Sequence, residues 1–404
     1  MLINQTFEID SCDDVELNIK RTSKLEYRIS YDDEKDLKAI VFIIGGYGAN
    51  ANIYFLDSYR NYIAKNFDVA TINVFYHCFC QRRSDVEKYS AFTMFTKDDV
   101  SNLSQALLEI GVNINVNLEN AQQCYELLNQ NITTLKSQRK LAQNYQAKFT
   151  STFIPPNGDY QNYGIMAALD HINALKDLVK RFPKLADLPK IYGGGSYGGY
   201  LSLLIAKIAP WYVDGVIDNS GSALPPLNYI LGREMEHSYG DYYEDFPHNR
   251  IIFFLKTHWT RKENSPYFFN NENYFIRTLL NKDHLILQSQ KNKNIIYVSY
   301  HSDKDPLTPA NFKQQTMQIL KILGYDVSLN LIDENKIDGK FIKNLDHGCG
   351  IPDKALFRKE LPLMLEKLQK RKSFMQENSI SYPCGNKVFI FKDVGDKFEL
   401  VIKD

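Results

Sequence analysis

Apolar residues alternate with polar ones at the start of the chain and gather in short continuous runs farther along. The alternating stretches 7–21 and 25–34 predict two antiparallel strands. We therefore expect residues 1–37 to form an N-terminal β extension of a sheet.

Farther along, apolar runs alternate with stretches of helical spacing. Residues 39–44 and 69–76 are continuous apolar runs, and between them residues 52–67 repeat apolar positions at the period of a helix. Strands that are apolar on both faces are typical of parallel sheets covered by helices on both sides, so this order predicts an α/β fold with a mostly parallel central sheet. The same rhythm resumes later in the chain, and we expect the core to consist of residues 38–80 and 151–371.

Three segments depart from this rhythm. Residues 81–150 are polar, poor in glycine and contain two long helical runs, which predict a mainly helical insertion. Residues 223–286 are aromatic and charged and are expected to form a cap or lid, in which the aromatic side chains more often serve packing than sugar binding. Near the end, the stretch 388–402 predicts two strands around a Gly-Asp turn, so residues 382–404 are expected to form a C-terminal β-hairpin.

The balanced charge of the chain argues against some classes of binding partner. Among 404 residues, 44% are hydrophobic, and 48 basic side chains balance 48 acidic ones. A neutral protein of this kind has no global electrostatic attraction to nucleic acid or to an anionic membrane. No run reaches about 18 consecutive apolar residues, and the first residues lack a basic and apolar leader. We therefore expect no nucleic-acid partner, no membrane span and a cytoplasmic location.

The six cysteines are scattered and show no paired CxxC spacing, which favours reduced thiols over disulfides or a zinc site. The stretch His77 to Cys80 offers three potential metal ligands, but no second cluster completes four-coordination. We expect neither a metal nor a cofactor.

The stretch KIYGGGSYGGYLSLL, Lys190 to Leu204, contains the pattern G-x-S-x-G in Gly194, Ser196 and Gly198. An apolar strand ends at the glycines and a helical run follows the serine, which is the context of a nucleophile elbow. Such a turn holds the serine in a strained conformation and needs small residues two positions before and after it. A glycine loop of purely structural role is the alternative interpretation.

A serine hydroxyl needs a base to act as a nucleophile, and the base needs an acid to orient it. Asp303 and Asp305 follow the apolar strand 294–300, and His347 lies in a loop after the next predicted strand. Because the carboxyl ends of parallel strands meet at one edge of a sheet, we expect these residues on the same edge as Ser196. The order serine, acid, histidine is one of the known arrangements of a catalytic triad.

A hydrolytic site of this kind also needs two donors for the developing oxyanion. The backbone N–H of Tyr197, directly after the nucleophile, is the first candidate. The glycine-rich loop Gly45 to Gly48 supplies the second, either through a backbone N–H at Gly46 or Tyr47 or through the Tyr47 phenol.

The motifs GGYG, GGSYGGY, HSDKDPLTP and DHG resemble those of the α/β-hydrolase superfamily, and within it the catalytic domain of prolyl-oligopeptidase-type serine hydrolases. The resemblance implies an α/β-hydrolase fold in which Ser196 is the nucleophile and His347 the base. It implies that Asp305 is the acid, because Asp305 stands four residues before Pro309 as the family's acid does. It also implies an oxyanion donor from the hydroxyl of Tyr47.

The chain departs from that family at several points. Ser302 stands where glycine is usual in the acid loop, and Ile44 precedes Gly45 where many relatives carry His-Gly. The β-propeller of the oligopeptidases has no counterpart in the segment of about 40 residues before the core. The resemblance covers residues 38–371.

The chain as a whole, including the stretches 45–69 and 73–83, also resembles a bacterial family found in species that glycosylate their flagellin. Together the resemblances imply a serine hydrolase that acts through an acyl-enzyme on a carboxylic ester, such as an acylated sugar or a glycan precursor. Three alternatives stay open: an acyltransferase using the same triad in glycan modification, a prolyl-oligopeptidase-like peptidase, and a non-catalytic binding module. The acyl group, the alcohol and the oligomeric state do not follow from the sequence.

Overall fold

The computed structural model describes residues 1–48, 52–235, 240–369, 371–373 and 375–404. The residues directly after the glycine-rich loop, part of the second insertion and one position at the end of the expected core therefore lie outside the described residues. Among the helices in the described ranges, none combines the length and the apolarity needed to cross a membrane.

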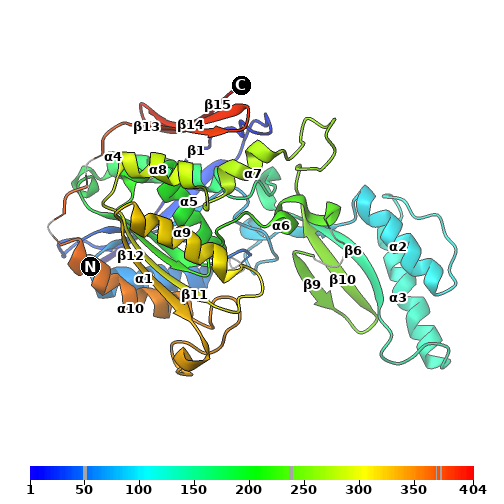
Figure 1. The fold of residues 1–404 in the computed structure, drawn as a ribbon. Coiled ribbons are helices and arrows are strands. Elements are labelled where there is room, and N and C mark those ends of the chain that lie inside the picture. The colour runs from blue at the N-terminus through cyan, green and yellow to red at the C-terminus, as the bar shows by residue number, and fades with distance from the viewer. Residues whose placement is uncertain (49–51, 236–239, 370, 374) are drawn as a thin grey trace.

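Eight strands form the central sheet, in the order β1-β2-β4-β3-β7-β8-β11-β12 (Figure 1). Their bounds are Leu2–Asp10 (β1), Lys24–Asp32 (β2), Ile40–Ile43 (β3), Ala70–Phe75 (β4), Lys190–Gly195 (β7), Gly215–Asn219 (β8), Ile296–Ser302 (β11) and Asp326–Ile332 (β12). β2 is antiparallel to both of its neighbours, and the other pairs of this sheet are parallel. This strand order and direction are those of the α/β-hydrolase fold, so the predicted fold class is confirmed.

Helices cover both faces of the central sheet. They are α1 (Ile53–Phe67) and α10 (Asp353–Lys367) on one face, and α4 (Ile165–Arg181), α5 (Tyr197–Ile208), α8 (Lys282–Lys291) and α9 (Ala310–Ile322) on the other. Along β3, Val41 and Ile43 pack toward α1 and α10, whereas Ile40 and Phe42 belong to the core on the opposite face. The strand therefore buries side chains on both faces, which is why it reads as a continuous apolar run.

A second, smaller sheet stands beside the core (Figure 1). It contains β5 (Phe92–Met94), β6 (Ala147–Ile154), β10 (Asn249–Leu255) and β9 (Tyr242–Asp245), and packs with α2 (Lys97–Glu109) and α3 (Ala121–Ser137). β6 pairs in parallel with β10, so the two insertions share one sheet although they are far apart in the sequence. The polar pattern of the first insertion indicated its helices but not its strands.

The N-terminal segment turns earlier than its pattern indicated. β1 ends at Asp10, and the Asp14 carboxylate accepts the N–H of Leu17 at 3.1 Å in a loop closed by a bridge between Asp14 and Ile19. This loop carries Glu16 toward the core, where it takes part in a buried ion pair described below.

The C-terminal segment forms three strands, one more than its pattern indicated. They are β13 (Ser379–Cys384), β14 (Lys387–Val394) and β15 (Lys397–Lys403). In β13 the side chains of Ile380, Tyr382 and Cys384 are buried in alternation, and the Tyr382 hydroxyl donates to the Lys207 carbonyl at 2.6 Å. The extra strand thus anchors this small sheet to α5.

Candidate active site

Ser196 lies on a sharp turn between β7 and α5. Its backbone has φ 55° and ψ −119°, a strained conformation for a residue with a side chain. A Cβ on Gly194 would lie 1.8 Å from the Ile44 carbonyl oxygen, and one on Gly198 would lie 1.9 Å from the same atom. Only glycine fits at these two positions, because the loop after β3 passes directly against the turn.

A chain of hydrogen bonds joins Ser196 to His347 and Asp305. His347 Nε2 lies 2.7 Å from Ser196 Oγ, and His347 Nδ1 lies 2.8 Å from Asp305 Oδ2. Asp305 follows β11 and His347 lies in a loop after β12, at the edge of the sheet where β7 also ends. Asp303 is exposed and stands outside this chain of hydrogen bonds.

The surroundings of Asp305 keep its carboxylate ionised. Burial by itself raises the pKa, but the hydrogen bond with His347 and the N–H groups of Thr308 and Leu307 outweigh it and lower the pKa of Asp305 to about 2. An ionised Asp305 fixes the proton of the imidazole on Nδ1, so that Nε2 can accept the proton of the serine hydroxyl.

The carboxyl end of β8 connects Ser196 and the loop of His347 through hydrogen bonds. The Ser196 N–H donates to the Asn219 carbonyl at 2.7 Å. Asn219 Nδ2 donates to the Gly348 carbonyl at 3.0 Å, and the Gly348 N–H donates to Ser220 Oγ at 3.1 Å. Sequence reasoning missed Asn219 and Ser220, although their place directly after a buried strand was a usable signal.

The candidate oxyanion donors differ in whether they are near Ser196 and free to donate a hydrogen bond there. Tyr197 is the first residue of α5, so its N–H has no acceptor within the helix. A Cβ on Gly46 would lie 3.4 Å from Ser196 Cβ, which places the Gly46 backbone against Ser196. The Tyr47 hydroxyl donates instead to Asp241 Oδ1 at 2.8 Å, and a phenol has a single proton to donate. Of the options for the glycine-rich loop, this geometry favours the backbone of Gly46.

A small cavity of about 40 Å³ opens beside Ser196. Five tyrosines line it together with His347: Tyr47, Tyr163, Tyr197, Tyr200 and Tyr229. Its deep side is buried, and Leu307 at its mouth is 54% exposed. Sequence reasoning missed the roles of Tyr163 and Tyr229 in this cavity, because neither lies in a motif.

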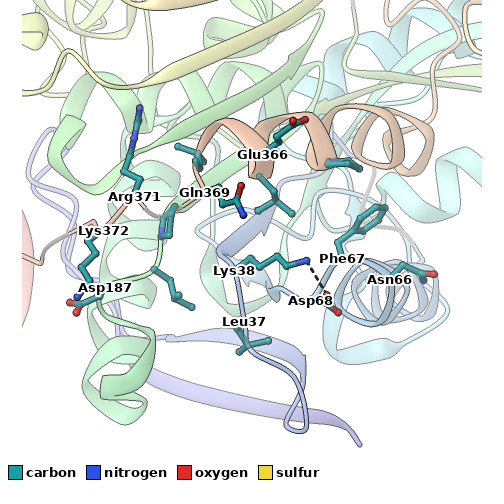
Figure 2. Close-up of a pocket in the computed structure, with 15 residues that line it drawn as sticks. Leu37, Lys38, Asn66, Phe67, Asp68, Asp187, Glu366, Gln369, Arg371 and Lys372 are labelled. Atoms are coloured by element: carbon teal, nitrogen blue, oxygen red, sulfur yellow. Dashed lines mark hydrogen bonds and ion pairs between the residues drawn. The ribbon is translucent and has the colours of Figure 1, made fainter.

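A larger cavity, of about 660 Å³, lies at the opposite edge of the sheet (Figure 2). Lys38 and Pro189 line it just before β3 and β7 begin, so it is at the amino ends of the parallel strands. Figure 2 shows Lys38 paired with Asp68, with 3.1 Å between Nζ and Oδ2. In the described part of the chain, no serine, cysteine or histidine lines this cavity, and its charged lining side chains are Lys38, Asp68, Asp187, Glu366, Arg371 and Lys372.

The chain is similar to one protein family and to several proteins of known structure. The model of the family described as "Protein of unknown function (DUF2920)" matches residues 5–402. No match was found among curated proteins. Among solved structures, the chain is similar to acylaminoacyl peptidase from Pyrococcus horikoshii, with 14% identity and a TM-score of 0.44, over 93% of this chain and 43% of that one. The chain thus spans less than half the length of that peptidase.

Two esterases of known structure are also similar to the chain. An esterase from the fungus Rhizomucor miehei shows 12% identity and a TM-score of 0.43, over 92% of this chain and 84% of that one. A bacterial brefeldin A esterase shows 12% identity and a TM-score of 0.40, over 91% of this chain and 74% of that one.

Proposed function

The chain belongs to the DUF2920 family, and we propose that it is a serine hydrolase that cleaves a carboxylic ester through an acyl-enzyme at Ser196. The observation that carries the proposal is the unbroken chain of hydrogen bonds from Asp305 through His347 to Ser196 Oγ, with 2.8 Å and 2.7 Å between the bonded atoms. The strained turn supports the proposal. A nucleophile elbow holds its serine in a strained backbone conformation between two glycines, as Ser196 is held between Gly194 and Gly198.

The reaction follows from these positions. His347 Nε2 takes the proton of the serine hydroxyl while Oγ attacks the ester carbonyl carbon, and the carbonyl oxygen becomes an oxyanion. The N–H groups of Tyr197 and Gly46 are the proposed donors to that oxygen. The intermediate then expels the alcohol, which receives the proton from His347, and leaves the acyl group on Ser196. Water, deprotonated by His347, releases the acid in the second half of the reaction.

The alcohol side of the substrate stays a prediction. We propose an acylated sugar or glycan precursor, as the resemblance of the whole chain implies. Acyl transfer to a sugar hydroxyl shares the first half of the reaction and differs only in whether an alcohol or water attacks the acyl-enzyme. A peptidase would form the same acyl-enzyme from an amide.

The test uses a fluorophosphonate probe, which reacts with activated serines. We expect the wild-type protein to be labelled at one serine and Ser196→Ala to remain unlabelled. Ser202→Ala is the matched control, because Ser202 is buried six residues farther along the chain, within α5, and its hydroxyl donates to the Gly198 carbonyl at 2.8 Å. A folded wild-type protein that is neither labelled nor able to cleave 4-nitrophenyl acetate would contradict the proposal and favour a binding role.

Product analysis separates the related reactions. Incubation of 4-nitrophenyl acetate with an added sugar distinguishes acid released to water from an ester formed on the sugar. An anilide with the same acyl group reports amide cleavage. We expect the ester to be cleaved, with the acid as the main product.

A further inference from the structure

The cavity beside Ser196 has a size that restricts what it can hold. Its volume of about 40 Å³ compares with about 10–15 Å³ needed by one water molecule on the same measure, so it admits about three atoms of that size. If the carbonyl group sits at Ser196, these atoms correspond to an acyl chain of two to four carbons.

The wall of the cavity is polar as well as aromatic. The Tyr200 hydroxyl is bonded to the Arg277 carbonyl at 2.9 Å, and the Tyr47 hydroxyl to Asp241. In contrast, the hydroxyls of Tyr163 and Tyr197 have no hydrogen-bond partner among the described residues, and neither is one of the fully buried polar atoms, although each residue as a whole is only 4% exposed. Hydroxyls that keep accessible surface in the wall of a cavity can bond to water. A ligand that displaces this water without accepting their hydrogen bonds leaves them unpaired, at a cost of about 1–3 kcal/mol for each group.

These two hydroxyls are donors at neutral pH. Burial raises the pKa of both Tyr163 and Tyr197 well above the ordinary value of 10, so both stay protonated. A ligand atom that accepts hydrogen bonds would therefore satisfy them, whereas an alkyl chain would leave them unpaired.

The wall is also held rigidly. Tyr163 has φ 56°, and its N–H donates to Gln161 Oε1 at 2.7 Å. Its carbonyl accepts a hydrogen bond of 3.0 Å from Arg277 Nε, at the end of α7 (Asn271–Arg277). Arg277 is in turn fixed by two hydrogen bonds of 2.7 Å to Glu16, and both side chains are buried. A wall fixed in this way does not expand easily around a longer chain.

We propose that this cavity is an acyl pocket selective for a short acyl group that carries an oxygen atom close to the carbonyl, such as a hydroxyacyl or alkoxyacyl group, and that the hydroxyls of Tyr163 and Tyr197 bind that oxygen. The inference rests on the proposed function, because it assigns the acyl side of the same ester substrate.

The test compares two esters that differ in one atom. 4-Nitrophenyl methoxyacetate and 4-nitrophenyl butyrate have acyl chains of equal length, with an oxygen in the first where the second has a CH₂ group. The ratio of their kcat/KM values is measured for the wild-type protein and for Tyr163→Phe and Tyr197→Phe. Comparing this ratio between proteins cancels the different intrinsic reactivity of the two esters.

We expect each Phe variant to lower the ratio by about three- to tenfold, which is the effect of one neutral hydrogen bond. Tyr192→Phe is the control, because the Tyr192 hydroxyl has no partner and the residue does not line this cavity, and this variant should leave the ratio unchanged. We also expect 4-nitrophenyl octanoate to be a much poorer substrate than the butyrate, and Tyr163→Ala to reduce that difference.

The outcomes separate the inference from the proposed function. Normal fluorophosphonate labelling with an unchanged ratio in both Phe variants overturns the acyl-pocket assignment and leaves the hydrolase intact. Octanoate cleaved as fast as butyrate by the wild-type protein overturns it as well. Absence of labelling and turnover in a folded protein contradicts the proposed function itself.

Discussion

The Tyr47 hydroxyl donates a hydrogen bond of 2.8 Å to Asp241 and thereby joins the loop after β3 to the second insertion. Burial raises the pKa of Asp241 to about 6, even though the Leu255 N–H and the Tyr47 hydroxyl both favour its charged form. The loop that contacts Ser196 through Gly46 is therefore held by the carboxyl group of Asp241, which precedes β9 in the second sheet and has a pKa of about 6.

Tyr47→Phe should destabilise the protein in a pH-dependent manner. The raised pKa means that the folded state binds a proton at Asp241 that the unfolded state releases, so this group's contribution to stability falls as pH rises from about 4 to 6. Without the tyrosine donor the charged carboxylate is more costly, and we expect a loss of about 1–3 kcal/mol at pH 8 and a smaller loss at pH 5.

Urea unfolding at the two pH values measures this effect. Asp241→Asn in the Tyr47→Phe background should remove the difference between pH 5 and pH 8. An equal loss at both pH values in the single variant would show that the Asp241 charge is not involved.

Asp305→Asn should abolish most of the activity while the fold is retained. An asparagine at this place stabilises the wrong imidazole tautomer, and we expect kcat to fall by about 10⁴-fold. Asp303→Asn is the control, because Asp303 is exposed and its loss should leave kcat unchanged. Ester turnover with each purified variant measures both, and equal losses would refute the assignment of the acid.

The same aspartate should contribute to acid sensitivity. Because its pKa is lowered from 3.8 to about 2, its stabilising effect is fully present above pH 4 and is lost as pH falls through 2. The wild-type protein should therefore lose more stability than Asp305→Asn between pH 4.5 and pH 2.5, as measured by thermal unfolding. A parallel loss in the two proteins would argue against this effect.

Of two glycine substitutions near Ser196, one should lower the stability of the protein and the other its activity. In Gly194→Ala the new Cβ meets the Ile44 carbonyl at 1.8 Å, so backbone must move and we expect a cost of about 3 kcal/mol or more. In Gly46→Ala the nearest atoms are at 3.3 Å and 3.4 Å, so the fold should persist. The added methyl group lies beside Ser196, and we expect kcat/KM to fall by about ten- to hundredfold.

Circular dichroism and ester turnover distinguish the two glycine variants. If Gly46→Ala were as active as the wild-type protein, the backbone of Gly46 would not be part of the oxyanion site. A Gly194→Ala protein with native stability would mean that the turn has room that the structure does not indicate.

Arg277→Met should be strongly destabilising because it leaves Glu16 buried without its partner. The expected cost is about 3–5 kcal/mol, the range found when one member of a buried ion pair is removed. The double variant Glu16→Gln with Arg277→Met should recover part of this loss, since no unpaired charge remains. Urea unfolding of the two single variants and the double variant measures the coupling, and strictly additive losses would contradict it.

Much of the candidate site was predictable because its signals are local. A nucleophile elbow needs a strand, small residues on either side of a serine and a following helix, all within about fifteen residues of the chain. Asp305 and His347 each follow a stretch that is recognisable in the sequence as a strand. Because the strands are parallel, the loops at their carboxyl ends lie at the same edge of the sheet. Predicting the positions of Ser196, Asp305 and His347 therefore needed only the order of the strands and helices.

The contacts that shape the site were not predictable in this way. The pairing of β6 with β10 joins segments about a hundred residues apart, and the polar pattern of 81–150 carried no strand signal. The sequence offers the Tyr47 hydroxyl as an oxyanion donor, but in the structure this hydroxyl donates its hydrogen bond to Asp241, nearly two hundred residues later. Tyr163 lines the cavity because Arg277 and Glu16 hold its backbone, and none of the three lies in a motif.

The sequence by itself determined the order of the strands and helices of the core, the position of the strained serine and the residues able to serve as acid and base. These depend on local periodicity and on fixed rules of parallel sheets. The tertiary structure decided which hydroxyls are already bonded, how large the cavity beside Ser196 is and which distant side chains fix its wall. These properties depend on packing between segments far apart in the chain, where a shift of one ångström makes or breaks a hydrogen bond, and no pattern of single residues records such distances.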